Sequence, residues 1–183
     1  MKKIWLFIGR MNPPHKWHTS VIQKALWEND EVLVLLWSSG VIDESNPLSF
    51  EQRKYLLQKF FWENKNLKIN IIKDTKTDEQ WVQNISENIK KYFWEDIFLN
   101  IYGWDFQNDS AIIAMKQFEN ILWKNISYIR VDRFLETLEY NGEKFHISAT
   151  NLRNALRNWE FVEKFCNKEL VEEIIKLFKS NYY

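Results

Sequence analysis

The chain has little glycine and almost no cysteine. Four glycines occur in 183 residues, whereas ordinary usage of roughly 7% would give about thirteen. The single cysteine, Cys166, has no second thiol with which to form a disulfide or a CxxC metal pair. A disulfide-stapled secreted fold is therefore excluded, and a reducing compartment is favoured.

An excess of one charge and a long hydrophobic run are also absent. Basic and acidic residues number 25 each, so a strongly basic surface for nucleic acid is not predicted. The apolar run that begins at Ile4 lasts about six residues, which is too short for a signal peptide or a membrane span. We expect a cytoplasmic protein that binds neither nucleic acid nor membrane and acts on a small molecule. A homo-oligomer stays possible, because the sequence does not reveal the oligomeric state.

Apolar runs of strand length alternate with segments of helical period. The expected strands are Ile4–Ile8, Glu31–Leu36, Leu67–Ile72, Ile97–Tyr102 and Ile126–Val131. The expected helices are Thr19–Leu26, Ser49–Phe61, Asp78–Phe93, Ser110–Leu122, Asn151–Arg157 and Lys168–Lys179. This alternation predicts an α/β fold, a Rossmann-like doubly wound parallel five-stranded sheet with helices on both faces. No linker or repeat marks a second domain, so we expect one domain over residues 1–183, with a core at 1–157 and C-terminal helices at 158–183.

Ligands of an open parallel sheet bind beyond the carboxyl ends of its strands, so the loops that follow the strands should carry chemistry. The first loop reads GRMNPPHKWH and runs from Gly9 straight into a helix. A helix start offers unpaired N–H groups and a partial positive charge, which together attract an anion. His15 and His18 add donors, although a His-x-x-His spacing also occurs in metal sites and without function.

A second stretch, HISATNLR, places two hydroxyls and a guanidinium at another predicted helix start. Ser148 or Thr150 could simply cap that helix. With Arg153 they could also hold a polyphosphate tail. Two such helix starts on one sheet suggest a nucleoside triphosphate.

The two stretches resemble the GRFxPxHxGH and ISxTxxR signatures of HxGH nucleotidyltransferases. The segment between them, SSGVIDESNPLSFEQR, resembles the NPLSFEER region of short nicotinamide-nucleotide adenylyltransferases. The resemblance extends from the first strand to about Arg157. It implies transfer of AMP from ATP to nicotinamide mononucleotide (NMN), giving NAD and pyrophosphate, with Mg²⁺ held mainly by the ATP phosphates.

The resemblance also implies roles for particular residues. The catalytic residues would be His15, His18 and Arg153. The nucleotide-binding residues would be Gly9, Arg10, Met11, Lys16, Trp17, Asp105, Ser148 and Thr150. The acceptor-binding residues would be Ser38, Ser39, Asn46, Arg53 and Arg133. No protein ligand to a metal is predicted. Asp105 could equally cap the helix that follows it, and Arg133 could be a solvated surface residue.

Ten tryptophans contrast with the four glycines. Trp17 stands where the HxGH signature has glycine. Five tryptophans follow helical runs, at the site where glycine supplies a left-handed turn: Trp27, Trp62, Trp94, Trp123 and Trp159. Trp37 and Trp104, like Trp17, fall in expected ligand loops, whereas Trp5 and Trp81 have no local reason for glycine. Our hypothesis is that UGA codons, which mean glycine in the source organism, were translated here as tryptophan.

Other functions stay open on these residues. Phosphate-binding motifs do not identify the acceptor, so pantetheine phosphate or glycerol phosphate could replace NMN in an adenylyl- or cytidylyltransferase. Trp17 also keeps open a nucleotide-binding module that does not catalyse. A fragment of a class I aminoacyl-tRNA synthetase is disfavoured, because the chain has no KMSKS-like segment.

Overall fold

The computed structural model describes residues 1–38, 40–93, 96–103, 105–131, 137–140 and 143–182. The chain divides into two compact units. Unit 1 comprises Met1–Gly9, Ile22–Ser39 and Lys65–Asp132, and unit 2 comprises Arg10–Val21, Gly40–Asn64 and Arg133–Tyr183. The single domain expected over residues 1–183 stays a prediction.

Unit 1 is built on a five-stranded sheet. Its strands are β1 (Lys2–Gly9), β2 (Glu31–Ser38), β3 (Leu67–Lys73), β4 (Ile97–Gly103) and β5 (Ile126–Arg130). They lie in the order β3-β2-β1-β4-β5, and every neighbouring pair is parallel. The predicted parallel five-stranded sheet is confirmed. The chain changes direction across the sheet between β1 and β4, where folds of this class bind their ligands.

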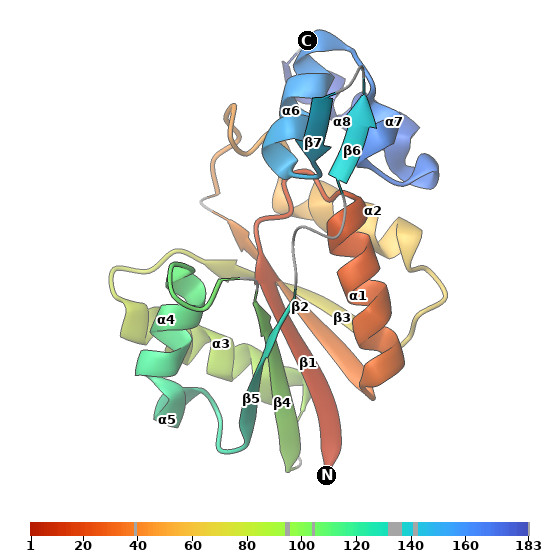
Figure 1. Cartoon of the computed structure of the whole chain (residues 1–183). Coiled ribbons are helices and arrows are strands. Elements are labelled where there is room, and N and C mark those ends of the chain that lie inside the picture. The colour runs from red at the N-terminus through yellow and green to blue at the C-terminus, as the bar shows by residue number, and fades with distance from the viewer. Residues whose placement is uncertain (39, 94–95, 104, 132–136, 141–142, 183) are drawn as a thin grey trace. The chain divides into compact units, whose positions relative to one another are not determined.

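Both faces of the sheet are covered, as the nearly continuous apolar strands predict. Ile4 and Leu6 of β1 belong to the core cluster that includes side chains of α3 (Asp78–Tyr92), α4 (Ser110–Gln117) and α5 (Glu119–Leu122). The alternate residue Trp5 stacks on Phe7 and meets Tyr102 edge-on. Figure 1 shows α3, α4 and α5 on one side of the sheet and α1 (Lys16–Glu28) on the other.

One expected helix of unit 1 is divided in two. The prediction of a continuous helix over Ser110–Leu122 is wrong, because α4 ends at Gln117 and α5 starts at Glu119. Phe118 lies between them with φ −115° and ψ 35°, outside the helical region. Its side chain packs against the sheet core, so tertiary packing interrupts the helical pattern here.

Unit 2 consists mainly of helices. They are α2 (Phe50–Phe60), α6 (Ala149–Asn158), α7 (Val162–Phe165) and α8 (Lys168–Tyr182). The unit also holds the first residues of α1 and the antiparallel hairpin of β6 (Thr137–Tyr140) and β7 (Glu143–His146). Its core includes Leu48, Leu56, Leu152, Leu170 and Ile174. The last helix contributes Leu170, Ile174 and Phe178 to this core.

The hairpin and α7 were not predicted from the sequence, because β6, β7 and α7 are each only four residues long.

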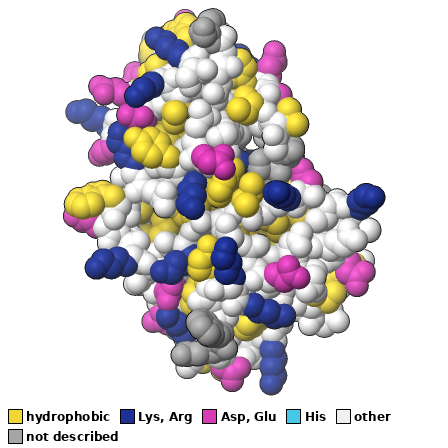
Figure 2. All heavy atoms as spheres, turned by 180° about the vertical axis from the view of Figure 1, so that it is seen from behind, with side chains coloured by type: hydrophobic (Ala, Val, Ile, Leu, Met, Phe, Trp, Pro, Cys, Tyr) yellow, Lys and Arg dark blue, Asp and Glu magenta, His cyan; other side chains and the backbone are white. Residues whose placement is uncertain are grey.

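Figure 2 shows Lys and Arg side chains interspersed with Asp and Glu side chains, as the equal numbers of the two signs suggest. In the described part of the chain, every helix lacks the length or the apolar character needed to cross a membrane.

Candidate functional site

The first phosphate motif is the loop between β1 and α1, which lies in unit 2 from Arg10 onward. Its residue Met11 has φ +46° and is 1% exposed. The loop ends where α1 begins at Lys16, and the Thr19 N–H donates to the carbonyl of His15 at 3.2 Å. The loop therefore leads directly into the N-terminus of α1, where an anion is favoured.

The two histidines of this loop lie against each other. Their ring centroids are 3.8 Å apart, and both side chains are buried. The backbone N–H of His15 donates to Nδ1 of His18 at 3.3 Å. Because Nδ1 of His18 accepts a hydrogen bond, the neutral ring carries its proton on Nε2. His18 is thereby held in a form that can donate from Nε2.

The second phosphate motif is the N-terminus of α6. Ser148 is its N-cap and accepts from the Asn151 N–H at 3.1 Å, so the capping alternative holds for Ser148. Thr150 does not cap the helix, and its Oγ1 accepts from one terminal nitrogen of Arg153 at 3.0 Å. Thr150 is exposed at the first turn of the helix.

Arg153 joins the two motifs. Its other terminal nitrogen donates to the carbonyl of Asn12 at 3.0 Å, although the two residues are 141 positions apart in the chain. Burial lowers the pKa of Arg153, and repulsion from Arg157 and Arg10 lowers it further. Arg10 and Arg157 are thus close enough to Arg153 to repel it, and such a cluster of positive charge is suited to a polyanion.

The middle motif supports the same loop from the α2 side. Ser49 caps α2, and Gln52 completes a capping box with it. Arg53 is 1% exposed; it donates to the carbonyl of Arg10 at 2.5 Å and to that of Ser49 at 3.2 Å. Burial lowers the pKa of Arg53 to about 10. Its predicted contact with the acceptor stays a prediction, and its backbone contacts hold the first phosphate loop in place.

The predicted acceptor residue Asn46 lies in a turn that Asp43 organises. The carboxylate of Asp43 accepts from the backbone N–H groups of Ser45 at 2.8 Å and Asn46 at 2.7 Å. The pKa of Asp43 is lowered, chiefly by the hydrogen bond from Asn46. Asn46 is therefore already engaged with Asp43 through both its backbone and its side chain.

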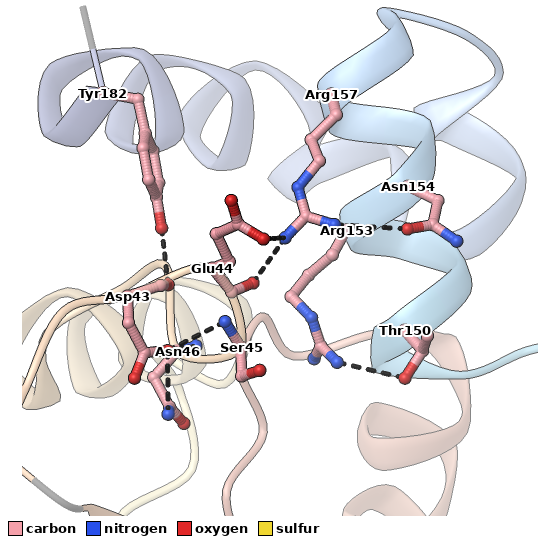
Figure 3. A network of polar contacts seen from close by, with 9 residues as sticks. All are labelled: Asp43, Glu44, Ser45, Asn46, Thr150, Arg153, Asn154, Arg157 and Tyr182. Carbon is pink, nitrogen blue, oxygen red and sulfur yellow. Dashed lines mark hydrogen bonds and ion pairs between the residues drawn. The ribbon is translucent and has the colours of Figure 1, made fainter.

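Helices α6 and α8 hold this turn from outside (Figure 3). Arg157 donates to the carbonyl of Glu44 at 2.7 Å and lies 3.8 Å from its carboxylate. The Tyr182 hydroxyl donates to the carbonyl of Asp43 at 2.5 Å. Figure 3 also shows Arg153 and Arg157 extending from α6 on the same side of the helix as this turn. The turn that contains the predicted acceptor residue Asn46 is thus held by α6, the helix that begins at the second phosphate motif.

Several predicted site residues lie outside unit 2 or outside the described residues. Gly9 ends β1, and Ser38 ends β2, in unit 1. The Asp105 carboxylate accepts from the N–H groups of Gln107 and Asn108, each at 3.0 Å. The pKa of Asp105 is lowered, chiefly by the side chain of Asn108. Asp109, not Asp105, caps α4. Ser39 and Arg133 fall outside the described residues.

One tryptophan fits the glycine hypothesis closely. Trp159 ends α6 with φ +57° and ψ 33°, the left-handed conformation that favours glycine. Trp17 lies inside the first turn of α1 and is 8% exposed, with its ring centroid 5.5 Å from that of His18. A bulky indole thus occupies space next to a histidine predicted to contact phosphate.

Other tryptophans differ from expectation. Trp27 lies within α1, because that helix continues to Glu28. Trp123 is extended, and Trp62 is not among the described residues with positive φ. Trp37 belongs to β2 rather than to a loop, because β2 continues to Ser38, and its ring contacts that of Trp81. Trp94 and Trp104 lie outside the described residues.

Trp5 and Trp81, the two tryptophans without a local reason for glycine, both have buried indoles. Within the described part of the chain, neither Nε1 makes a hydrogen bond. An unpaired buried donor costs about 1–3 kcal/mol. Both rings nevertheless pack against aromatic neighbours, Phe7 for Trp5 and Trp37 for Trp81.

Asn12 was not among the predicted site residues, yet its amide makes two hydrogen bonds to the backbone of Leu48. An asparagine inside a phosphate motif was the available signal, because a short amide commonly pairs with backbone.

The described residues contain no group of three or more His, Cys, Asp or Glu side chains placed to hold a metal ion.

The sheet order and the two joined phosphate motifs define an α/β nucleotide-binding protein. A family model described as cytidylyltransferase-like matches residues 6–155. The chain belongs to this cytidylyltransferase-like family.

Individual relatives agree with this family. A nicotinamide/nicotinic acid mononucleotide adenylyltransferase of Acinetobacter baylyi is 23% identical over 161 residues, which cover 86% of this chain and 77% of the relative. A crystal structure of a bifunctional NMN adenylyltransferase/ADP ribose pyrophosphatase from Francisella tularensis superposes with a TM-score of 0.77 at 21% identity. A putative nicotinate-nucleotide adenylyltransferase from Vibrio parahaemolyticus gives a TM-score of 0.59 at 20% identity, over 96% of this chain and 99% of that one.

The Francisella protein is much longer than this chain. The superposition covers 99% of this chain but only 52% of that protein, so the chain spans about half of its length. The likeness shows a shared fold, and any shared activity is a matter of proposal.

Proposed function

We propose that the chain transfers AMP from ATP to nicotinamide mononucleotide, giving NAD and pyrophosphate. The observation that carries this proposal is the bridge by Arg153, which brings the histidine loop and the N-terminus of α6 together around one cluster of donors. The Acinetobacter relative, named for action on nicotinamide or nicotinic acid mononucleotide, supports the choice of acceptor.

In the proposed reaction, an oxygen of the acceptor phosphate attacks the α-phosphorus of ATP. The bond between that phosphorus and the bridging oxygen to the β-phosphate breaks, and pyrophosphate leaves with the electron pair. Catalysis of this kind needs positioning and charge stabilisation, because the acceptor itself is the nucleophile. The N–H groups at the start of α1, with His15 and His18, would stabilise charge at the α-phosphate, and Arg153 and Thr150 would hold the β- and γ-phosphates.

The proposed metal is Mg²⁺ bound to the triphosphate. Mg²⁺ usually keeps several waters and binds substrate phosphates rather than an all-protein cage, and the side chains named at the joined motifs, those of His15, His18, Thr150 and Arg153, include no carboxylate. These residues fit a metal that arrives with ATP. A Francisella neighbour was solved in complex with AMP and a manganese ion, which favours a divalent cation in this fold. When bound, the ion would neutralise charge on the leaving pyrophosphate.

We place the protein in the cytoplasm and expect small-molecule substrates, with a homo-oligomer possible.

A second candidate function is a module that binds ATP without catalysis. Trp17 favours it, because its indole lies beside His18 where the family signature has glycine. Binding of ATP without turnover, persisting in Trp17→Gly, would support this second candidate.

The test is product formation with a panel of acceptors. The chain is incubated with ATP and Mg²⁺ and with NMN, nicotinic acid mononucleotide, pantetheine phosphate or glycerol phosphate, and each adenylylated product is quantified. CTP with glycerol phosphate tests the cytidylyltransferase alternative. We expect NAD from NMN at the highest rate, and His18→Ala should abolish it. A faster reaction with a non-pyridine acceptor would refute the acceptor assignment.

A further inference from the structure

Asn12, for which the sequence predicted no role, lies at the junction where the first phosphate loop contacts Leu48 and Arg153. Its side chain is 2% exposed, and its amide pairs with both backbone groups of Leu48. Oδ1 accepts from the Leu48 N–H at 2.9 Å, and Nδ2 donates to the Leu48 carbonyl at 3.0 Å. The amide thus ties the loop to the segment that leads into α2.

The same residue also contacts the second phosphate motif. The Asn12 carbonyl accepts the hydrogen bond from Arg153. Through its side chain and its backbone, Asn12 therefore links three stretches: the loop after β1, the acceptor segment before α2, and the start of α6.

Further hydrogen bonds hold the chain on either side of this junction. Next to Leu48, the carbonyl of Pro47 accepts from the side chain of Asn181 at 2.7 Å. On the loop side, Arg53 holds the carbonyl of Arg10. Arg53 also donates to the carbonyl of Ser49, so the spacing between the loop and residues 46–49 is set by the Asn12 amide together with Arg53.

The chemistry of this junction requires an amide of this length. An aspartate could accept from the Leu48 N–H, but its second oxygen would face a carbonyl oxygen and its charge would be buried. An alanine would leave a buried N–H and a buried C=O of Leu48 without these partners. A glutamine has the right groups on a side chain one methylene longer.

We propose that Asn12 is a positioning residue, which fixes the acceptor segment at residues 46–49 relative to the two phosphate motifs. The role rests on the proposed adenylyl transfer, whose rate depends on the alignment of the acceptor oxygen with the α-phosphate. A misplacement of about 1 Å can cost a reaction about 100-fold in rate.

The kinetic test compares the chain with Asn12→Ala and Asn12→Asp, each also in the Trp17→Gly background. The matched control is Asn100→Ala in β4, which removes another buried amide that bonds to a side chain, Asn29. We expect kcat for NAD formation to fall about 100-fold in both Asn12 variants, with Kd for ATP and KM for NMN changed less than about threefold. The control should keep its kcat even if its melting temperature falls.

A second measurement does not depend on activity. Hydrogen exchange of the Leu48 amide, followed by NMR, should accelerate at least tenfold in Asn12→Ala while amides in β4 keep their rates. Unchanged Leu48 exchange would overturn the proposal, and so would an unchanged kcat in a folded Asn12 variant of an active chain. If neither parent makes NAD but Leu48 exchange accelerates as expected, the proposed function fails and the positioning of residues 46–49 by Asn12 is retained.

Discussion

Replacement of Trp159 by glycine or alanine separates the backbone at the end of α6 from the indole attached to it. Trp159 has φ +57°, which costs an ordinary L-residue roughly 1–2 kcal/mol and costs glycine nothing. Both variants lose the same contacts, a T-shaped contact with Phe178 at 6.3 Å and the Lys179 ammonium 4.7 Å from the ring centroid. The difference between the two variants therefore reports on the backbone.

Glycine also loses more chain entropy than alanine on folding, by about 0.4–1 kcal/mol. The net expectation is that Trp159→Gly exceeds Trp159→Ala in free energy of unfolding by about 1 kcal/mol, or about 2–4 °C in Tm for a chain of this length. Urea denaturation followed by circular dichroism measures it. The control pair is at Trp62, which is 78% exposed and is not one of the described residues with positive φ. There the alanine variant should equal or exceed the glycine variant in free energy of unfolding. An alanine variant at 159 as stable as the glycine variant would show that the backbone at this position does not favour glycine.

Three further predictions concern the phosphate site and the core of unit 2. Arg153→Lys should lower kcat/KM for ATP by about 10- to 100-fold, because lysine cannot span Asn12 and Thr150 as the guanidinium does; steady-state kinetics with unchanged values would contradict this. Burial raises the pKa of Cys166 to about 12, so alkylation of the native thiol should stay slow from pH 7 to 9 and become fast in denaturant. Prompt labelling of the folded chain would show that the thiol is exposed. Ile174→Ala should lower the free energy of unfolding by about 2–5 kcal/mol, because the side chain is fully buried, and a loss below 1 kcal/mol in a urea titration would argue against the described packing.

The sheet was predictable largely because its central strands are buried on both faces and read as continuous apolar runs. The first strand, for example, alternates Ile4 and Leu6 on one face with Trp5 and Phe7 on the other. The antiparallel pair β6 and β7 was missed, although the sequence between them is Asn-Gly, a strong hairpin signal. These strands have only four residues each, so periodicity could not identify them.

The residue types of the phosphate site were predictable, but the contacts among them were not. His15, His18 and Arg153 could be named from the motifs, since helix starts and their flanking residues are local in sequence. The bond from Arg153 to Asn12 joins positions 141 residues apart, and no local pattern specifies it. The burial of Arg53 against the Arg10 carbonyl is likewise a property of the folded chain.

The glycine hypothesis receives mixed support from the backbone. Trp159 occupies a left-handed position, whereas Trp27 and Trp37 lie within regular elements that tolerate an ordinary residue. Helix and strand boundaries placed by periodicity are uncertain by two or more residues, which explains the misassigned positions. The codons decide the question: UGG at Trp17 and Trp159 would end the hypothesis, and UGA there would support it.

Adenylyl transfer at the joined phosphate motifs can be followed through the α-phosphate of ATP. The chain and its Trp17→Gly variant are incubated with ATP labelled at the α-phosphate, Mg²⁺ and NMN, and label in NAD is counted. We predict labelled NAD together with an equal amount of pyrophosphate, at a rate at least tenfold higher in the variant. Absence of labelled NAD from both folded proteins would contradict the account.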